Sequence, residues 1–542
     1  MIAGVENLNI KYPSKIKKFY LFHRRRIWNP HEKVFMGWER KRGKLREFNL
    51  LLKNKRQTSY IEKLPNDLPH FKYVLTIDED TRLPRDSAIK LIGCIDHPLN
   101  HPIVDPISQK VISGYGIIQP RMTTKFSQAR ATVFSRLFST TAGIDSYNGP
   151  AADVYQDLFN NSIFYGKGIY DIDTMESTIG DKIPENQVLS HDLLEGLYTK
   201  VGFATDIFLF EGFPESYKEY ILRMHRWIRG DWQIISWLKN NKLKGNNFSL
   251  SDKWKIFDNL RRSVVPIFSV LFILLSYLLF NDSYLFSLIY IVLVIGTPFI
   301  ISYIIRFFEW PKEMGVFMKF NTLIDNLDEV LWQIIYRFIF LLDQAIISFQ
   351  AVTVSLFRNF FSHRHMLRWA SSHEVSKGVR GTFREFIYMM FPTQIISLSA
   401  LFLILNYHSG FYFYLTITLW FISPFIAYQI SKKEKKYEYR TRDLKLLRNI
   451  ACRSARFFLE LSRSDGNQLI PDHYQEEPVT NSPAATSPTN IGMLLLSNLT
   501  AYDFGYISFS NFLERTNKLF KSLNLLERYR GHFYNWYDIR TL

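Results

Sequence analysis

Cysteine is scarce in this sequence: only Cys94 and Cys452 occur among 542 residues, and they lie far apart. So few cysteines argue against a disulfide framework and against a cysteine-based metal site. The scarcity is typical of a protein whose non-membrane parts face the cytosol. The first 18 residues also lack the apolar core of a signal peptide, so we expect none there.

Signals for nucleic-acid recognition are also missing. The chain has no zinc-finger spacing, no RNP-like motif and no heptad run, and we find no internal repeat. The net charge is nevertheless +17. Much of this excess flanks apolar segments, as in the run 432–436, which favours a role in membrane topology over a nucleic-acid footprint. We expect no nucleic-acid partner.

Strands and helices alternate between residues 71 and 210. The predicted strands are 71–77, 111–119 and 204–210, and the predicted helices are 86–95, 128–139 and 189–200. This alternation predicts an α/β domain with a Rossmann-like, largely parallel sheet. Ligands of such sheets bind at the carboxyl ends of the strands. A long amphipathic helix is predicted to follow over residues 215–238.

Apolar residues concentrate between about residues 264 and 431, where four runs approach the ~20 residues that cross a bilayer. They are 264–280, 284–305, 386–405 and 411–430. Very short loops without Lys or Arg join the first two and the last two, whereas 306–384 and the segment after 431 are rich in both. The positive-inside rule then places both termini and the α/β domain in the cytosol. Residues 326–358 are apolar but interrupted by charges, which predicts a helix lying in the membrane interface or, alternatively, a fifth span.

Asp78 and Asp80 directly follow the first predicted strand. Residues i and i+2 of an extended strand face the same way, so the two carboxylates share a side. Such a pair can hold a hard cation, Mg²⁺ or Mn²⁺, which can neutralise a diphosphate leaving group. An isolated Asp-x-Asp triplet is more often a solvated loop, but the preceding apolar strand favours a metal site.

Asp192 lies in the predicted helix 189–200, and two interpretations stay open for it. Ser190 or Asp192 can cap the amino end of this helix. Alternatively, Asp192 is a general base that removes a proton from an acceptor hydroxyl. The two roles can coexist.

Arg223, Arg226 and Trp227 stand at positions i, i+3 and i+4 and therefore share one helix face. Two guanidinium groups beside an indole can clamp phosphate oxygens and support a sugar or base. An interfacial helix near lipid headgroups would have the same composition.

Two more segments are candidates for ligand contacts. The basic run 40–44, which contains Arg42 and Lys44, offers a flexible loop for a diphosphate, although such a run is also typical of a solvated surface. Gly166 and Gly168 flank Lys167 in a turn that lets backbone approach a ligand. This turn lacks the full glycine spacing of a phosphate loop.

The order of these motifs resembles processive family-two-like glycosyltransferases of the GT-A fold. The chain has, in this order, a strand that ends in Asp-x-Asp, a single Asp on a later helix, a helix with an Arg-Trp motif, and membrane spans. The detailed sequence is similar to the cyclic β-1,2-glucan synthases of glycosyltransferase family 84. The similar stretches are 38–45, 76–85, 114–121, 153–159, 166–171, 189–196 and 225–233. The membrane region resembles the family more loosely.

The resemblance implies an inverting transfer of glucose from UDP-glucose to the 2-hydroxyl of a growing β-1,2-glucan, by a multipass protein of the bacterial inner membrane. It assigns Asp78 and Asp80 to the metal and diphosphate, Asp192 to the base, and Arg226 and Trp227 to the diphosphate and acceptor sugar. The donor side then also includes Arg42, Lys44 and Arg223, and the acceptor side includes Gly166 and Lys167.

Members of this family are far longer than this chain, and they carry the first strands of the GT-A sheet upstream. Residues 487–492 and 529–538 resemble the opening of their downstream glycan-active helical module. We therefore expect an internal part of a synthase, with a missing upstream or downstream half as a candidate partner. The expected parts are a donor-side segment (1–60), a GT-A-like core (61–258), a membrane region (259–435), a cytosolic linker (436–490) and a truncated helical module (491–542). The alternative is a catalytically inactive or partner-dependent fragment that lacks the uridine-binding strands.

Overall fold

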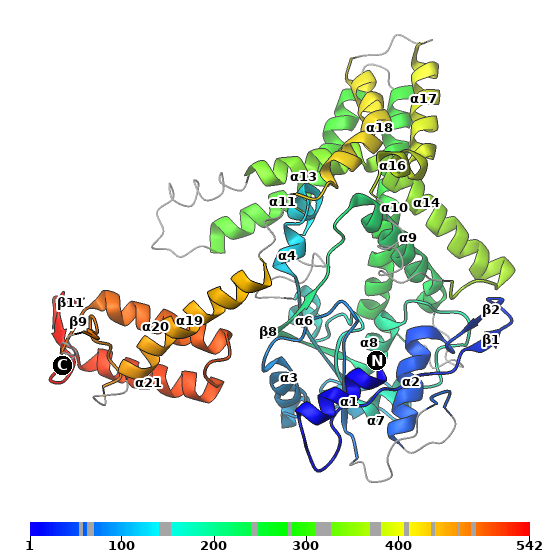
Figure 1. The fold of residues 1–542 in the computed structure, drawn as a ribbon. Coiled ribbons are helices and arrows are strands. Elements are labelled where there is room, and N and C mark those ends of the chain that lie inside the picture. The colour runs from blue at the N-terminus through cyan, green and yellow to red at the C-terminus, as the bar shows by residue number, and fades with distance from the viewer. Residues whose placement is uncertain are drawn as a thin grey trace. The chain divides into compact units, whose positions relative to one another are not determined.

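The computed structural model divides into two compact units, Met1–Glu434 and Lys435–Leu542, which we treat separately (Figure 1). The structure describes residues 1–53, 58–61, 70–139, 153–239, 248–279, 284–309, 327–368, 381–405, 411–434, 440–462, 467–477 and 484–542.

A four-stranded sheet forms the centre of the first unit. Its strands are β3 (Tyr73–Thr76), β7 (Gly168–Asp171), β6 (Ile117–Thr124) and β8 (Val201–Glu211), in that order. β7 runs antiparallel to both β3 and β6, and only β6 and β8 are parallel. The sheet is therefore mixed, and the prediction of a largely parallel sheet was wrong. Strand and helix positions alone do not reveal that β7 inserts between β3 and β6 in the opposite direction.

The predicted strand 111–119 is two strands, β5 (Val111–Ser113) and β6. Gly114 separates them with a φ of +67°, and a Cβ there would overlap the carbonyl oxygen of His101. β5 pairs with β4 (Ile103–Val104) outside the main sheet. Glycine is required at this turn because its φ is positive and the neighbouring backbone is too close for a side chain.

Helices cover both faces of the sheet. On one face, Leu91 and Ile95 of α3 (Ser87–Ile95) pack against Ile118 and Ile169. The adjacent residues Ile117 and Tyr170 point to the other face, because side chains alternate along a strand. There they meet α7 (Ile172–Ile179) and α8 (Asp192–Thr199). The predicted helices 86–95 and 189–200 are thus confirmed.

The predicted helix 128–139 is broken into α4 (Phe126–Ala129) and α5 (Val133–Phe138). Thr132 starts α5, where its hydroxyl accepts from the Ser135 backbone in a capping box. A residue that caps a helix has extended backbone, so it interrupts any helix that reaches it from before.

The remaining elements of the amino-terminal part are short or peripheral. They are α1 (Ile2–Lys11), β1 (Ile27–Asn29), β2 (Val34–Met36), α2 (Arg40–Leu52) and α6 (Val154–Phe159). The run 40–44, predicted as a flexible loop, is instead the first part of α2. This difference matters for the site, since a helix presents only some of its residues to one side.

The predicted amphipathic helix 215–238 is α9 (Tyr217–Gln233) followed by the short helix η2 (Ile235–Leu238). Ser216 caps it by accepting from the Glu219 backbone. One face of α9 packs on α14 (Leu341–Phe357), where Ile228 meets Ala351 and Val352. The helix that carries the Arg-Trp motif is therefore attached to the apolar region.

Among the described residues, three helices are long and apolar enough to cross a membrane: α10 (Leu250–Leu279), α11 (Tyr284–Glu309) and α18 (Phe411–Ile430). α10 contains the predicted span 264–280 except its last residue, which lies outside the described residues, and α11 and α18 contain 284–305 and 411–430. Two bent pairs raise the number to five if each pair is one span. The short loops predicted at 281–283 and 406–410 lie outside the described residues.

The bent pairs contain the other two apolar segments. α16 (Phe383–Met389) and α17 (Phe391–Leu405) meet at 66°, where Pro392 has no backbone N–H with which to continue a helix. The predicted span 386–405 is thus bent near its start. The segment 326–358 forms α13 (Leu327–Ile339) and α14, and this second pair, with the turn η4 (Arg358–Ser362), is bent by 56°.

The second unit has its own apolar core. Its helices are α19 (Thr441–Leu461), α20 (Pro488–Asp503) and α21 (Phe509–Leu525), with the strand pairs β9 (Ala485–Thr486) with β12 (Tyr537–Asp538) and β10 (Arg528–Tyr529) with β11 (His532–Phe533). Leu469, Leu494 and Leu519 lie in the core. The segment 436–490, predicted as a linker, therefore includes a helix of 21 residues and residues that pack in this core.

Two leucines of α21 allow a matched test of the second core. Leu519 is fully buried, whereas Leu525 is 69% exposed. We expect Leu519→Ala to lower the local unfolding free energy by about 2–4 kcal/mol and Leu525→Ala to change it by less than about 0.5 kcal/mol. Hydrogen exchange of α20 and α21 amides in the whole chain measures both. Equal effects of the two substitutions would contradict this core.

Candidate active site

The acidic turn after β3 is fixed at its backbone. The Thr81 hydroxyl accepts from the Asp78 N–H at 3.3 Å, and the Thr81 N–H donates to the Asp78 carbonyl at 3.1 Å. Arg82 then forms a bridge with Phe210 of β8. The Asp78 side chain is thus held at the carboxyl end of β3, as the sequence predicts.

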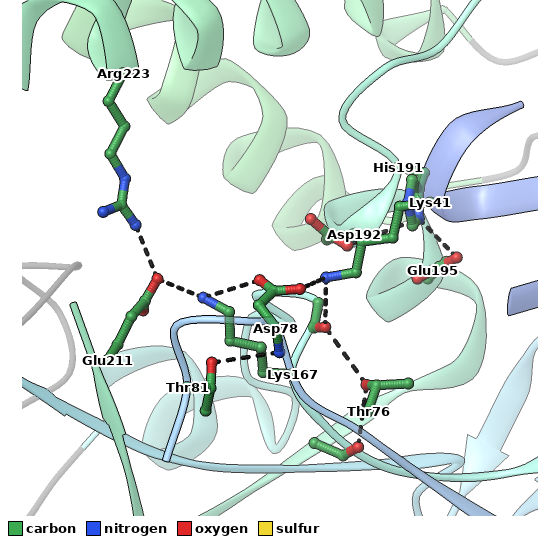
Figure 2. A network of polar contacts seen from close by, with 12 residues as sticks. Lys41, Thr76, Asp78, Thr81, Lys167, His191, Asp192, Glu195, Glu211 and Arg223 are labelled. Atoms are coloured by element: carbon green, nitrogen blue, oxygen red, sulfur yellow. Dashed lines mark hydrogen bonds and ion pairs between the residues drawn. The ribbon is translucent and has the colours of Figure 1, made fainter. Parts of the chain in front are cut away.

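Two lysines flank the Asp78 carboxylate (Figure 2). Lys41 Nζ lies 2.6 Å from Oδ1, and Lys167 Nζ lies 3.3 Å from Oδ2. Burial alone would raise the pKa of Asp78, but the two ammonium groups outweigh it and hold that pKa below its usual range. Asp78 is therefore ionised at neutral pH.

Lys167 also contacts a second, more deeply buried carboxylate. Glu211, at the carboxyl end of β8, is only 3% exposed and accepts from both Lys167 and Arg223. The Arg223 guanidinium carbon lies 4.7 Å from the ring centre of Trp227. The contacts therefore run as a chain of alternating charges from Lys41 to Arg223 (Figure 2). This chain ends beside the indole of Trp227.

Asp192 enters the site from the first turn of α8. A Cβ on Gly166, whose φ is +76°, would overlap the Asp192 carboxylate, so the two residues are in direct contact. Asp192 Oδ1 is buried and has no hydrogen-bond partner within the described part of the chain. The helix has no side-chain cap, and His191 occupies the capping position. The capping role considered for Ser190 or Asp192 was wrong.

Behind Asp192 lies a buried histidine. His191 Nδ1 is 2.8 Å from Glu195 and 3.7 Å from Asp192. Burial alone would lower the pKa of His191, but the two carboxylates outweigh both burial and Lys41 and raise it. The imidazolium is therefore favoured between two anionic groups.

Arg226 interacts electrostatically with the carboxylates of Asp78, Asp80 and Glu211. Burial and the neighbouring Arg223 lower its pKa to about 10, while Asp78, Asp80 and Glu211 oppose that change. Arg226 stays charged at neutral pH. Asp80 lies near Gly212, on which a Cβ would be 3.3 Å from Asp80 Oδ2.

Asp78 and Asp80 offer oxygen ligands suited to a hard cation. Mg²⁺ is commonly bound by one or two carboxylates, with substrate phosphates and water completing its shell, so this donor set fits Mg²⁺ or Mn²⁺. His191, Asp192 and Glu195 also bring ligand atoms within 4.8 Å of one another. Because His191 Nδ1 lies at hydrogen-bond distance from Glu195, we interpret these three residues as a cluster of ion pairs and not as a metal site.

Most of the residues predicted from the sequence meet at this site. Contacts or charge interactions connect Asp78, Asp80, Gly166, Lys167, Asp192, Arg223, Arg226 and Trp227. Arg42 instead pairs with Glu39 and donates to the Ile183 carbonyl, and the Lys44 side chain is exposed. These two do not join the network.

Sequence reasoning missed four members of the network: Lys41, His191, Glu195 and Glu211. Lys41 belongs to the same basic run as Arg42 and Lys44. Only the directions in which successive residues of α2 point decide which of the three faces the site. Glu211 directly follows the predicted strand 204–210, so the rule that ligands gather at carboxyl strand ends would have found it. His191 and Glu195 have no signal beyond their proximity to Asp192.

The raised pKa of His191 predicts a pH dependence of stability. A group whose folded pKa is raised contributes stability that is complete below its unfolded pKa, about 6.5 for His, and is lost as pH rises through the folded value. We expect the advantage of the native chain over His191→Gln to shrink as the pH rises above about 6.5. Unfolding midpoints measured across this range test it.

His473, with 64% of its side chain exposed, provides the control. The midpoint difference between the native chain and His473→Gln should change less with pH, because its ion pair with Asp472 is exposed and screened by solvent. A difference for His191→Gln that does not shrink as the pH rises would contradict the buried ion pair.

We compared the chain with known proteins. No protein-family model matches the chain. The cyclic β-(1,2)-glucan synthase NdvB of Rhizobium meliloti (strain 1021) is 36% identical over 552 residues, which covers 99% of this chain but 19% of that relative. The resemblance inferred from the motifs is thus confirmed, and by sequence the chain corresponds to a segment of the cyclic β-(1,2)-glucan synthases.

Proposed function

We propose that this chain carries the glucosyl-transfer site of a membrane-bound β-1,2-glucan synthase that uses UDP-glucose and inverts the anomeric carbon. The observation that carries the proposal is the convergence of Asp78, Asp192 and the Arg223–Trp227 pair in one polar network. The chain's 36% identity to a cyclic β-(1,2)-glucan synthase supports the choice of product.

The donor diphosphate binds on the cationic side of the site. Lys41, Lys167 and Arg226 provide positive charge around the acidic turn. Asp78 and Asp80 would hold Mg²⁺ or Mn²⁺, which when bound neutralises charge on a diphosphate. The cationic side chains then stabilise the negative charge that develops on the leaving UDP.

Asp192 is the base on the acceptor side. Its side chain is 29% exposed, so the carboxylate can accept the proton of a glucan 2-hydroxyl. As that proton moves to Asp192, the hydroxyl oxygen bonds to C1 of glucose, and the bond from C1 to the diphosphate breaks. A single displacement of this kind inverts the configuration at C1.

Gly166 and Trp227 shape the acceptor side. Gly166 brings backbone against Asp192 without a side chain, and Trp227 is 36% exposed beside Arg223. An accessible indole near the base offers a stacking surface for a sugar ring.

The three apolar helices and the basic segments around them support a multipass protein of the bacterial inner membrane. The loops that join the predicted spans lack Lys and Arg, whereas the other connections are rich in both. This asymmetry supports a cytosolic position for the catalytic site and both termini.

A second candidate, a partner-dependent fragment, is favoured by the position of β3. Among the described strands β3 has a neighbour on one side only, β7. The unpaired edge of a strand next to the site can accept a further strand, and the relative is far longer than this chain. Under this alternative, activity requires segments of a longer protein in addition to this chain.

The base assignment predicts that Asp192→Asn lowers glucosyl transfer by at least about 10²-fold, because the amide cannot accept the proton. Membranes supplied with Mg²⁺ or Mn²⁺ and labelled UDP-glucose should otherwise incorporate label into β-1,2-linked polymer. Asp181→Asn, at a side chain that is 92% exposed, is the control and should retain activity.

The assay is run with this chain alone and with the chain joined to the segments that flank the matched region in the relative. Activity only in the longer form would support the partner-dependent alternative. No incorporation by either form would contradict the proposed function.

The contact between Gly166 and Asp192 generates a second prediction. Gly166→Ala places a methyl group against the carboxylate and strains a positive φ, so the base moves. We expect transfer to fall about 10²-fold, since small displacements of reacting groups are costly. Gly93→Ala in α3, where nothing lies within 4 Å of the added Cβ, should leave the rate unchanged. A Gly166→Ala protein as active as Gly93→Ala would contradict the geometry.

A further inference from the structure

The first half of α19, a helix of the second unit that is labelled in Figure 1, has a row of exposed apolar side chains. Leu444, Leu446, Leu447 and Ile450 are between 50% and 59% exposed. Leucine and isoleucine at these spacings, two turns of helix long, fall on one side of an α-helix. A cluster of exposed apolar residues of this kind marks a surface that binds a protein or a membrane.

In the second half of α19, the same side of the helix packs against protein. Ala455 is buried there, and Phe457, Phe458 and Leu461 pack against the core of the second unit. Leu447 and Leu444 precede Phe458 by 11 and 14 positions, so they lie in the same row of the helix. One continuous apolar face is therefore half covered by protein and half exposed.

The opposite face of α19 is basic. The helix contains five basic residues, Arg442, Lys445, Arg448, Arg453 and Arg456, and two acidic ones. The acidic residues have local partners, because Asp443 accepts from the Arg440 backbone and Glu460 pairs with Arg456. The side chains of Arg442, Lys445 and Arg448 in the bare half are exposed.

The chain connects α19 to a candidate membrane span. α18 ends at Ile430 and α19 begins at Thr441. A segment of this length reaches at most about 40 Å when fully extended. Lys432 and Lys433 directly follow the span, as basic residues do on the cytosolic side of a membrane. The bare half of α19 thus cannot move far from the membrane surface.

We propose that residues 441–450 bind the surface of the bilayer, with the leucine row at the boundary between headgroups and acyl chains and the basic face toward anionic headgroups. A helix with one apolar face, a basic polar face and low overall hydrophobicity is the kind that lies in a membrane interface. The charge excess favours anionic lipid over a protein groove. The contact anchors the second unit at the membrane.

Spin labels in the whole chain, reconstituted into nanodiscs, test this inference without an activity assay. In a Cys94→Ser, Cys452→Ser background, Leu447→Cys carries a label on the bare row and Lys445→Cys carries a matched label on the basic face. We expect the label at 447 to collide severalfold more with oxygen than with a water-soluble nickel chelate, and the label at 445 to show the reverse. The nickel protection at 447 should weaken when phosphatidylglycerol is replaced by phosphatidylcholine.

Each other result overturns the proposal. Access of both reagents at 447 means an exposed helix, and exclusion of both means a protein cover, either a second copy or another segment. Equal protection in the two lipids removes the anionic contact. Leu415→Cys on α18 reports insertion, and a label there that meets nickel removes the membrane tether on which the inference depends. The outcomes at 447 and 445 do not bear on the glucosyl-transfer site, whereas nickel access at 415 would also contradict the multipass topology of the proposed function.

Discussion

The candidate site depends on one buried ammonium group, that of Lys167. It is 5% exposed and lies between the carboxylates of Asp78 and Glu211. Lys167 is the cation that these two carboxylates, at the carboxyl ends of β3 and β8, share, while Lys41 pairs with Asp78 and Arg223 pairs with Glu211 on the outer sides. Because Lys167 precedes β7, the lysine connects both strands and, through Glu211, the guanidinium of Arg223 on α9.

Close backbone packing positions the other half of the site. Gly166 lets the turn before β7 touch Asp192, and Gly230 of α9 would place a Cβ only 2.5 Å from the Ser190 Cβ. The start of α8 is therefore enclosed between that turn and α9. The enclosure brings Asp192 and Asp78 to the same lysine, Lys41, and it leaves His191 and Glu195 buried behind Asp192 as an ion pair.

The same helix α9 connects the site to the apolar region. Ser355 of α14 donates to the Arg229 carbonyl at 3.0 Å, and the Gln233 side chain donates to the Met366 carbonyl at 2.8 Å. Gln233 also accepts from the Leu189 backbone, just before the loop that leads to Asp192. These contacts at the carboxyl-terminal end of α9 connect the apolar region to the loop that leads to Asp192.

The sequence by itself determined the local features: the acidic turn after an apolar strand, the shared face of Arg223 and Trp227, the glycine-flanked turn around Lys167 and the long apolar helices. Each depends on residues that are neighbours in the chain, where strand and helix periodicity decide the outcome. Only the tertiary structure decided the direction of β7, because strand pairing joins distant segments. It also decided that Lys41, rather than Arg42 or Lys44, reaches Asp78, since successive helix residues point about 100° apart. Glu211 and His191 likewise acquire their roles only from the packing of β8 and α8 around the site.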